Sequence, residues 1–285
     1  LRPIWLYAKA CSSLEKAEYE HSQTWHIYSS ENHHVMDFTV NWHFAKLAKD
    51  RPEYKDLKCD DGATLVFRHL DPLSAGDRAA LARFGEAHGL QIALQPAGPD
   101  SVEPLWPNTQ SLAFSHPAFD VRIGFEPLDF VQVNAGINRR MVHFAIEQLA
   151  VEPGHRVVDL FCGIGNFSLP LARRARMVLG VEGDVTLTQR AGVNAQRNGL
   201  DNAVFFTADL NEEPAGAPWL KKGYDKVLVD PPRSGAEFIL PHIAASGAWR
   251  LVYVSCHPAS LARDAGILVR EHGFTLKGAG VMDMF

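Results

Sequence analysis

A single cysteine near the carboxyl end of the chain has the surroundings of a nucleophile. Cys256 lies in the string VYVSCHP, directly after an apolar run that predicts a strand and directly before a predicted helix. Backbone amides at such a turn favour a thiolate, and the neighbours Ser255, His257 and Pro258 are not typical of a core. A free cysteine is most often a small buried core residue, so this simpler interpretation stays open.

A thiolate at this place suits chemistry on a pyrimidine. Carbon 5 of uracil is a poor nucleophile until a thiolate adds to carbon 6. The enolate that results can take a sulfonium methyl group, and a base then removes the carbon-5 proton. The string DPPRSG, which starts at Asp230, excludes two other methyl-transfer chemistries. Enzymes that methylate amino groups carry an aromatic residue where this chain has Arg233, and RNA cytosine carbon-5 enzymes carry a cysteine inside this string.

A second string, VVDLFCGIGNFSLPL from Val157 to Leu171, predicts a ligand cradle of strand, glycine turn and helix. Asp159 is expected at the carboxyl end of the strand, and Gly163 and Gly165 allow a close backbone approach to a ligand. Since the third glycine of the G-x-G-x-x-G pattern is missing, a nicotinamide enzyme is disfavoured. The acidic strand end would repel a pyrophosphate and attract a sulfonium, which favours S-adenosylmethionine. The alternative is a glycine turn that only joins a strand to a helix.

The elements that position these residues alternate strictly. Strands are expected at 177–181, 204–207, 226–229, 251–254 and 274–277, and helices at 186–198 and 258–272. This order predicts an α/β, Rossmann-like fold with a doubly wound, mostly parallel sheet. In such a sheet the carboxyl ends of the strands line one ligand-binding edge. The residues expected to converge there are Asp159, Glu182, Asp209, Asp230 and Cys256.

The first half of the chain predicts a smaller α+β domain that precedes this sheet. Strands are expected at 63–70, 91–96, near Leu112 and near Ile123, with a helix from Ser74 to His88 and a loop at 96–107. The segment 130–150 forms a bridge, with a helix capped by Asn134. Its polar Gln132 indicates either a ligand contact or a solvated edge strand.

Composition sets limits on the function. The chain has 285 residues, 46% of them hydrophobic, a net charge of −5 and a pI near 6.2. A nucleic acid would therefore need local basic patches, such as Arg139 with Arg140 or the cluster Arg173, Arg174 and Arg176, although such clusters are often solvated helix faces. No apolar run has the length of a membrane span, so a cytoplasmic protein without membrane association is expected.

Cysteine and histidine usage gives no support for a metal centre. The four cysteines are scattered without a C-x-x-C pair, which argues against a disulfide framework and against a zinc or iron–sulfur site. The histidines of residues 1–57 match no standard ligand spacing, so metal binding there is the minor interpretation. We predict no metal ligands, and the sequence indicates neither a protein partner nor an oligomeric state.

From about Gly62 onward the chain resembles the uracil-5 methyltransferases of RNA, most closely those that act on 23S ribosomal RNA. The matching strings are DGATLVFRHLDPL, FVQVNAGINRRMV, VVDLFCGIGNFSLPLA, VLGVEG, GYDKVLVDPPRSG and VYVSCHPASLARD. The resemblance implies transfer of a methyl group from S-adenosylmethionine to carbon 5 of a 23S uridine. Position by position, the family's methyl-donor contacts fall on Gln132, Phe161, Asn166, Glu182, Asp209 and Asp230. The nucleophile falls on Cys256.

The chain also departs from the family. Members begin with a β-barrel that binds RNA and a four-cysteine iron–sulfur cluster, for which this chain has no ligands. In the family, the sequence continues past the position of Phe285 to a general-base glutamate and a last strand, so we expect slow or absent turnover. His257 replaces an asparagine. The alternatives are the same reaction on a transfer-RNA uridine or another 23S uridine, and a non-catalytic module that binds S-adenosylmethionine or RNA.

The expected domains follow from this resemblance. Residues 1–57 have no assignment, residues 58–128 form the small α+β domain, and residues 129–285 form the class I methyltransferase domain without its last strand. Because residues 1–57 do not resemble the family, their removal is expected to leave the melting temperature nearly unchanged.

Overall fold

The computed structural model describes residues 2–10, 24–28, 35–39, 64–69, 71–108, 111–132, 134–212 and 223–283, the first three ranges for the backbone only. The chain divides into two compact units. The larger contains Leu1–Cys11, Ser115–Ile123 and Gln132–Phe285, and the smaller contains Ser12–Phe114 and Gly124–Val131. Two segments of the larger unit differ from the expected domains: Leu1–Cys11, which had no assignment, and Ser115–Ile123, which was expected in the small α+β domain.

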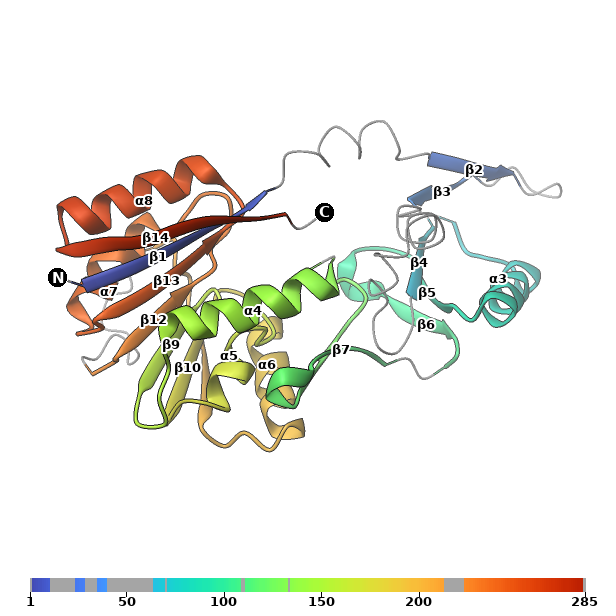
Figure 1. Cartoon of the computed structure of the whole chain (residues 1–285). Helices are drawn as coiled ribbons and strands as arrows, with labels where there is room; N and C mark the ends of the chain where they lie inside the picture. Colours follow the sequence, from blue (N-terminus) through green and yellow to red (C-terminus); the bar gives the residue numbers. More distant parts are fainter. Residues whose placement is uncertain are drawn as a thin grey trace. The chain divides into compact units, whose positions relative to one another are not determined.

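A seven-stranded sheet forms the centre of the larger unit (Figure 1), in the order β11-β10-β9-β12-β13-β1-β14. Every neighbouring pair is parallel. The chain order reverses between β9 and β12, which is the switch point of a doubly wound sheet and confirms the predicted fold class. The strands are β1 (Arg2–Ala10), β9 (Arg156–Leu160), β10 (Met177–Glu182), β11 (Ala203–Thr207), β12 (Lys226–Val229), β13 (Arg250–Ser255) and β14 (Phe274–Asp283).

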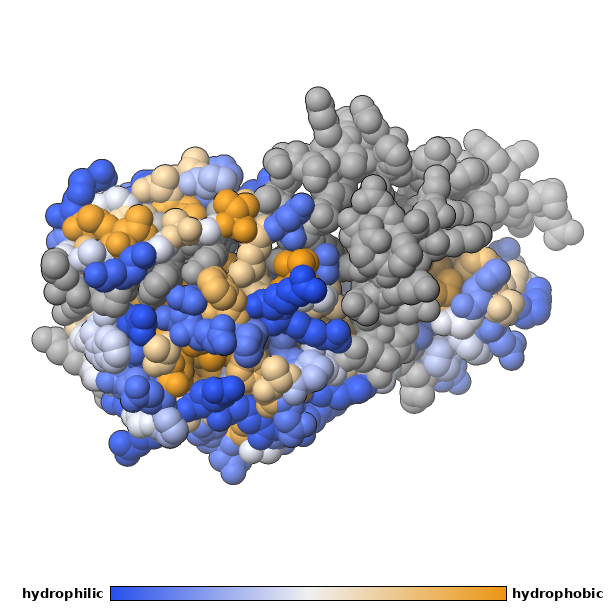
Figure 2. Space-filling view, in the orientation of Figure 1, coloured by the Kyte–Doolittle hydropathy of each residue, from blue (hydrophilic) through white to orange (hydrophobic). Residues whose placement is uncertain are grey.

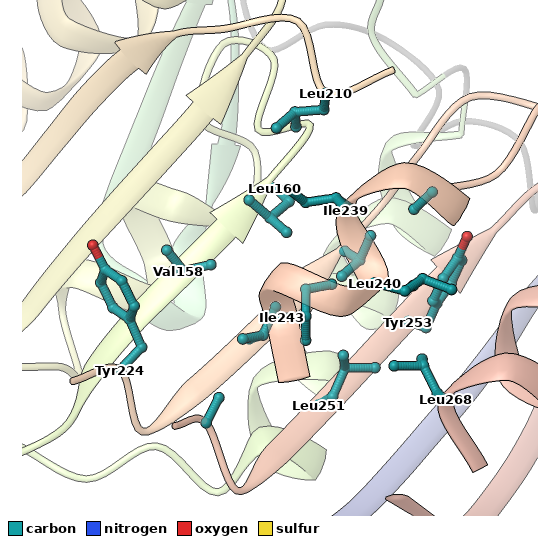
Figure 3. Packing of buried hydrophobic residues seen from close by; sticks show 14 of the residues in the cluster. Val158, Leu160, Leu210, Tyr224, Ile239, Leu240, Ile243, Leu251, Tyr253 and Leu268 are labelled. Atoms are coloured by element: carbon teal, nitrogen blue, oxygen red, sulfur yellow. The ribbon is translucent and has the colours of Figure 1, made fainter. Parts of the chain in front are cut away.

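Helices pack on both faces of this sheet. Alternate residues of each central strand point to opposite faces, and both sets are mostly apolar, as expected for a buried parallel sheet, with Asp159 and Lys226 as buried exceptions. One set packs with α7 and α8 in a cluster that includes Val158, Leu160, Leu251 and Tyr253 (Figure 3). On the other face α4 lies against β12, β13 and β14. The helices are α4 (Ala135–Leu149), α5 (Ser168–Ala172), α6 (Val185–Arg197), α7 (Leu240–Ala245) and α8 (Pro258–Arg270).

The strand β1 was not predicted. Its backbone pairs with β13 from Ile4 to Ala8 and with β14 along its whole length, with a register shift after Ile4. β1 therefore lies between β13, the strand that precedes Cys256, and β14, the outermost strand of the sheet. The last strand, predicted at 274–277, extends to Asp283 because it follows β1 over ten residues.

The smaller unit contains a three-stranded sheet in the order β4-β5-β6 and an antiparallel pair, β2 with β3. Ser74 caps α3, and Asp77 completes a capping box, so the predicted helix boundary is confirmed. The prediction of a loop at 96–107 is wrong in part, since 103–106 form a strand that pairs with β5. The elements are β2 (Thr24–Tyr28), β3 (Val35–Thr39), β4 (Thr64–Arg68), α3 (Ala75–His88), β5 (Gln91–Gln95) and β6 (Glu103–Trp106). Two further strands, β7 (Leu112–His116) and β8 (Val121–Phe125), pair with each other, and the segment Ser115–Ile123 that joins them belongs to the larger unit.

Candidate active site

The strand register brings the predicted residues to one edge of the large sheet. Leu160 of β9 pairs with Val181 of β10 and with Val229 of β12. The residues that follow these three positions are Phe161, Glu182 and Asp230. Since neighbouring parallel strands lie about 4.8 Å apart, these residues form one row, and β13 carries Cys256 at the same edge beside β12. The predicted convergence is confirmed for Glu182, Asp230 and Cys256.

The loop after β9 is a rigid cradle bordered by open space. Phe161 has a φ of 63°, a left-handed backbone that costs a non-glycine residue about 1–2 kcal/mol. The amide of Cys162, which donates to the carbonyl of Val181 at 3.1 Å, helps to hold this conformation. Gly163 has a φ of 53°, and a Cβ built on it would meet nothing within 4 Å. A ligand can therefore approach the backbone of the loop closely, as a nucleoside-type cofactor requires.

Glu182 is fixed at the mouth of this cradle by backbone amides. Its Oε2 accepts a hydrogen bond from Gly163 N at 3.0 Å, and its Oε1 accepts from Gly183 N at 2.8 Å and from Asp184 N at 3.2 Å. The half-buried carboxylate is therefore oriented before any ligand arrives. An oriented carboxylate at the end of the second strand is suited to hold ribose hydroxyls.

Asn166 belongs to a polar cluster that the sequence did not indicate. Its Oδ1 accepts a hydrogen bond from Asn138 Nδ2 and lies 2.9 Å from His116 Nε2, while its Nδ2 donates to Asn138 Oδ1 at 3.0 Å. His116 and Asn138 are both buried. These contacts use both lone pairs of Oδ1 and one of two N–H groups, so Asn166 retains one N–H for a ligand. The sequence feature that could have indicated this cluster is Asn138, which lies on the apolar face of α4, one turn after the N-cap Asn134.

The prediction that Asp159 lines the crevice is wrong. Asp159 is fully buried inside β9, where its Oδ2 accepts a hydrogen bond from Ser168 Oγ at 2.5 Å and its Oδ1 has no partner among the described residues. Burial, together with the nearby charges of Asp230 and Glu182, raises the pKa of this carboxyl to about 7. The strand continues one residue beyond Asp159, so the side chain points into the helix layer and not to the open edge.

The remaining predicted donor residues lie around the same unit in different environments. Asp230 is half-buried and directly follows β12, and its amide donates to the carbonyl of Leu160. Asp209 is exposed two residues after β11, and its Oδ1 accepts from both the backbone and the side-chain nitrogen of Asn211. Gln132 is half-buried in the segment before α4. Their roles toward a ligand stay predictions.

Cys256 is half-buried in a turn that two side chains stabilise. Ser255 Oγ accepts a hydrogen bond from His257 N at 3.0 Å, and His257 is the N-cap of α8, with its Nδ1 accepting from Ser260 N. Because asparagine is a preferred N-cap, a histidine whose Nδ1 is unprotonated can replace the family's asparagine here. Cys256 therefore stands at the amino end of a 13-residue helix, next to the backbone amides of its first turn.

The other described cysteine is unsuited to this role. Cys162 is buried, and burial raises the pKa of its thiol well above the usual value, with Asp159 and Glu182 adding to the effect. It remains a neutral thiol beneath the cradle. Among the two described free cysteines, Cys256 is the candidate nucleophile, and Cys11 and Cys59 lie outside the described residues.

Two of the five arginines proposed for RNA patches donate hydrogen bonds to the chain's own backbone. Arg173 donates to the carbonyls of Phe119, Asp120 and Asn198, and Arg139 donates to that of Ser115. These contacts attach Ser115–Ile123 to the larger unit. Figure 2 shows hydrophilic and apolar residues interspersed over the visible face of this unit.

The part of the chain that the structure describes shows neither a metal site nor a helix that could span a membrane. It contains no group of three or more His, Cys, Asp or Glu that could hold a metal ion. The histidine-rich segment within residues 1–57 lies outside the described side chains. None of its described helices has the length and apolar character that crossing a membrane requires.

Comparisons with known proteins agree with this geometry. Residues 121–217 match the family model described as tRNA (Uracil-5-)-methyltransferase. The chain is 54% identical over 237 residues to the 23S rRNA (uracil(1939)-C(5))-methyltransferase RlmD of Xanthomonas axonopodis pv. citri, and 53% identical to that of Stenotrophomonas maltophilia. Both alignments cover 83% of this chain and 53% of the relative, so the chain spans about half the length of these relatives.

A solved structure shows the same fold. The Pyrococcus abyssi tRNA (uracil-54, C5)-methyltransferase, in complex with S-adenosyl-L-homocysteine, matches with a TM-score of 0.57 at 24% sequence identity, over 72% of this chain and 49% of that one. At this identity the likeness concerns the fold, which is that of the class I methyltransferases. Together with the matches in sequence, it shows that the chain belongs to the RNA uracil-5 methyltransferase family.

Proposed function

We propose that this chain transfers a methyl group from S-adenosylmethionine to carbon 5 of a uridine in RNA, with Cys256 as the covalent nucleophile. The observation that carries the proposal is the position of Cys256. It lies at the amino end of α8, on the same sheet edge as the cradle formed by Phe161, Gly163 and Glu182. A thiolate and a nucleoside cradle at one edge are what carbon-5 methylation of a pyrimidine needs.

The residues of the cradle fit S-adenosylmethionine. The backbone at Gly163 borders open space, and Glu182 is an oriented acceptor for the ribose hydroxyls. We assign the remaining contacts to Gln132, Phe161, Asn166, Asp209 and Asp230. When bound, this cofactor supplies an electrophilic methyl group on a positively charged sulfur. The carboxylates of the edge favour that charge.

Cys256 performs the steps on the base. Its thiolate adds to carbon 6 of uracil, which breaks the double bond between carbons 5 and 6 and gives an enolate that is nucleophilic at carbon 5. After carbon 5 is methylated, a base removes its proton, the double bond forms again and the thiolate leaves. The target base must leave its stack to reach the thiolate, so the RNA is bound with a flipped nucleotide.

We infer that the substrate is a uridine of 23S ribosomal RNA, which the protein meets in the cytoplasm. The support is the 54% identity to proteins named for uracil 1939 of 23S ribosomal RNA. A transfer-RNA uridine is the second candidate, because the matching family model and the similar solved structure are named for transfer RNA. A third possibility is a module that binds S-adenosylmethionine or RNA without turnover.

One experiment tests these alternatives. The chain is incubated with radiolabelled S-adenosylmethionine and, in separate reactions, with a 23S fragment or a transfer-RNA transcript, and then analysed by denaturing gel electrophoresis. We expect label in the 23S fragment or in a covalent protein–RNA adduct. Both should be absent in Cys256→Ala and present in Cys59→Ala, a control that removes a thiol elsewhere.

The form of the product distinguishes the outcomes. Rapid turnover indicates an efficient base, and a persistent adduct indicates slow removal of the carbon-5 proton. Label in transfer RNA alone identifies the second substrate. If calorimetry shows donor binding but neither product nor adduct forms, the proposed reaction is wrong and the binding module remains.

A further inference from the structure

One buried carboxylate joins the segments on both sides of Cys256. Asp264 lies on α8 and is fully buried. Its Oδ2 accepts a hydrogen bond from the hydroxyl of Tyr253 on β13 at 2.6 Å and from the amide of Ala236 at 2.7 Å. Asp264 therefore links the strand before Cys256, the helix after it, and the loop that follows Asp230.

Arg263 extends this link along the loop. Its Nε and Nη2 both lie 2.8 Å from Asp264 Oδ1, Nη2 also donates to the carbonyl of Ser234 at 2.7 Å, and Nη1 lies 3.3 Å from a carboxylate oxygen of Glu237. Both oxygens of Asp264 are thus paired, which offsets the cost of burying a charge. The hydrogen bond to Asp264 raises the pKa of Arg263, so this partner stays charged.

The loop is shaped to meet this carboxylate. Gly235 is buried with a φ of 86°, and a Cβ at this position would lie 2.5 Å from Arg263 Nη2 and 2.6 Å from Asp264 Oδ2. Only glycine allows the backbone to pass so close. Burial and the adjacent Asp264 raise the pKa of the Tyr253 hydroxyl, which therefore remains a hydrogen-bond donor. Figure 3 shows Tyr253 at the α7 side of the sheet, among the residues of the core cluster.

We propose that Asp264 is a positioning residue, which fixes the segment from Asp230 to Gly235 relative to Cys256 so that both face the same substrate base. This inference rests on the function proposed above. The carboxylate of this ion pair is buried while the Arg263 side chain is 41% exposed. A buried charge of this kind is weak evidence for stability, since apolar packing of similar volume would serve as well. We infer that Asp264 instead fixes the relative positions of two segments, because its carboxylate accepts hydrogen bonds from donors that approach from fixed directions.

The test compares Asp264→Asn with Asp225→Asn. In Asp264→Asn the new NH₂ group faces either Arg263 or the donors Tyr253 and Ala236, so one of these contacts becomes repulsive. Asp225 is the matched control: its Oδ2 accepts from Arg156 N at 2.8 Å and joins two segments at the other edge of the sheet. Both variants are studied well below their melting temperatures.

Hydrogen exchange is the readout that does not depend on activity. We expect Asp264→Asn to speed amide exchange about tenfold in residues 230–239 and 252–260, with no change in the cradle 160–167. Asp225→Asn should leave all three segments unchanged. Faster exchange over the whole sheet, or in α8 alone, would mean that Asp264 only stabilises the fold and would overturn the proposal.

The second readout is adduct formation with RNA that contains 5-fluorouridine, which traps the thiolate adduct. We expect the rate in Asp264→Asn to fall at least about tenfold, with donor affinity unchanged by calorimetry. Tyr253→Phe, which removes one donor, should give a smaller loss. If the unmodified chain forms no adduct, the proposed function has failed, whereas the exchange experiment still decides the role of Asp264. An unchanged adduct rate in Asp264→Asn contradicts the proposal.

Discussion

The ligand-binding edge of the large sheet has two halves, a donor half at β9 and β10 and a Cys256 half at β12 and β13. The two halves are held by different kinds of contact. On the β9 and β10 side, a partly exposed carboxylate, Glu182, accepts hydrogen bonds from backbone amides of its own turn and of the neighbouring loop. On the β12 and β13 side, a fully buried carboxylate, Asp264, reaches a loop 28 residues away in sequence. At Glu182 the donor half is therefore held by backbone amides of nearby turns, whereas the Cys256 half depends on a buried side chain of α8 that must be folded first. This difference predicts that stability defects affect the Cys256 half more strongly.

The largest effect is expected from removal of the strand beside β13. Deletion of residues 1–11 removes β1 and leaves β13 and β14 unpaired at that position. Since ladder hydrogen bonds contribute about 0.5–1.5 kcal/mol each, we expect stability to fall by about 5 kcal/mol or more, measured by urea unfolding. Leu6→Pro, which removes one backbone donor of β1 and restricts its φ, should give part of this loss.

This expectation replaces the one drawn from the sequence, which was a melting temperature nearly independent of residues 1–57. Donor affinity measured at low temperature should change less than adduct formation, because β1 adjoins β13 and not β9. An unchanged unfolding curve after deletion would show that β1 contributes nothing to the sheet.

The second prediction concerns the pH dependence that Asp159 confers. Its carboxyl titrates near pH 7 in the folded protein and near 3.8 when unfolded, so the folded state binds the extra proton between these values. Stability should therefore fall as pH rises from 4 to 7, by about 4 kcal/mol if the whole shift is realised. Asp159→Asn should remove this slope and be the more stable protein at pH 8, as measured by thermal unfolding in a pH series.

The matched control is Asp201→Asn, an exposed carboxylate near the start of β11. It should leave the slope unchanged. If Asp159→Asn keeps the slope of the original chain, another buried group causes it.

The third prediction compares two glycines, one in each half. Gly235→Ala combines a left-handed φ with contacts below 3 Å, whereas Gly163→Ala has a left-handed φ and open space. We expect Gly235→Ala to cost about 2–4 kcal/mol and Gly163→Ala about 1 kcal/mol in urea unfolding. Equal costs would mean that the loop at Gly235 relaxes away from Asp264.

The smallest expected effect is on binding alone. Glu182→Ala removes an oriented carboxylate from the cradle and should weaken S-adenosylmethionine binding about ten- to a hundredfold, the loss of a charged hydrogen bond of ~1.5–3 kcal/mol. Calorimetry measures this directly, with Asp201→Ala as the control. Equal affinities in Glu182→Ala and the original chain would remove Glu182 from the donor site.

Much of the donor half could be predicted from the sequence. The periods of apolar residues located β9, β10, β11 and α6 to within two residues, and the N-caps Ser74 and Asn134 marked helix starts. Glu182 was predicted correctly because the apolar run before it is enough to place it at the end of a strand. The position of Cys256 was found for the same reason. These features depend on contacts between residues close in sequence.

The tertiary structure decided the features that depend on long-range contacts. Asp159 appeared to be at an open strand end, but Ser168 and the helix layer cover it. The roles of His116 and Asn138 appear only when the loop at Asn166 packs against them. The insertion of β1 between β13 and β14 joins residues that lie more than 200 positions apart. Strand pairing across such distances leaves no local pattern, because each partner shows only the period of a strand and not the identity of its neighbour.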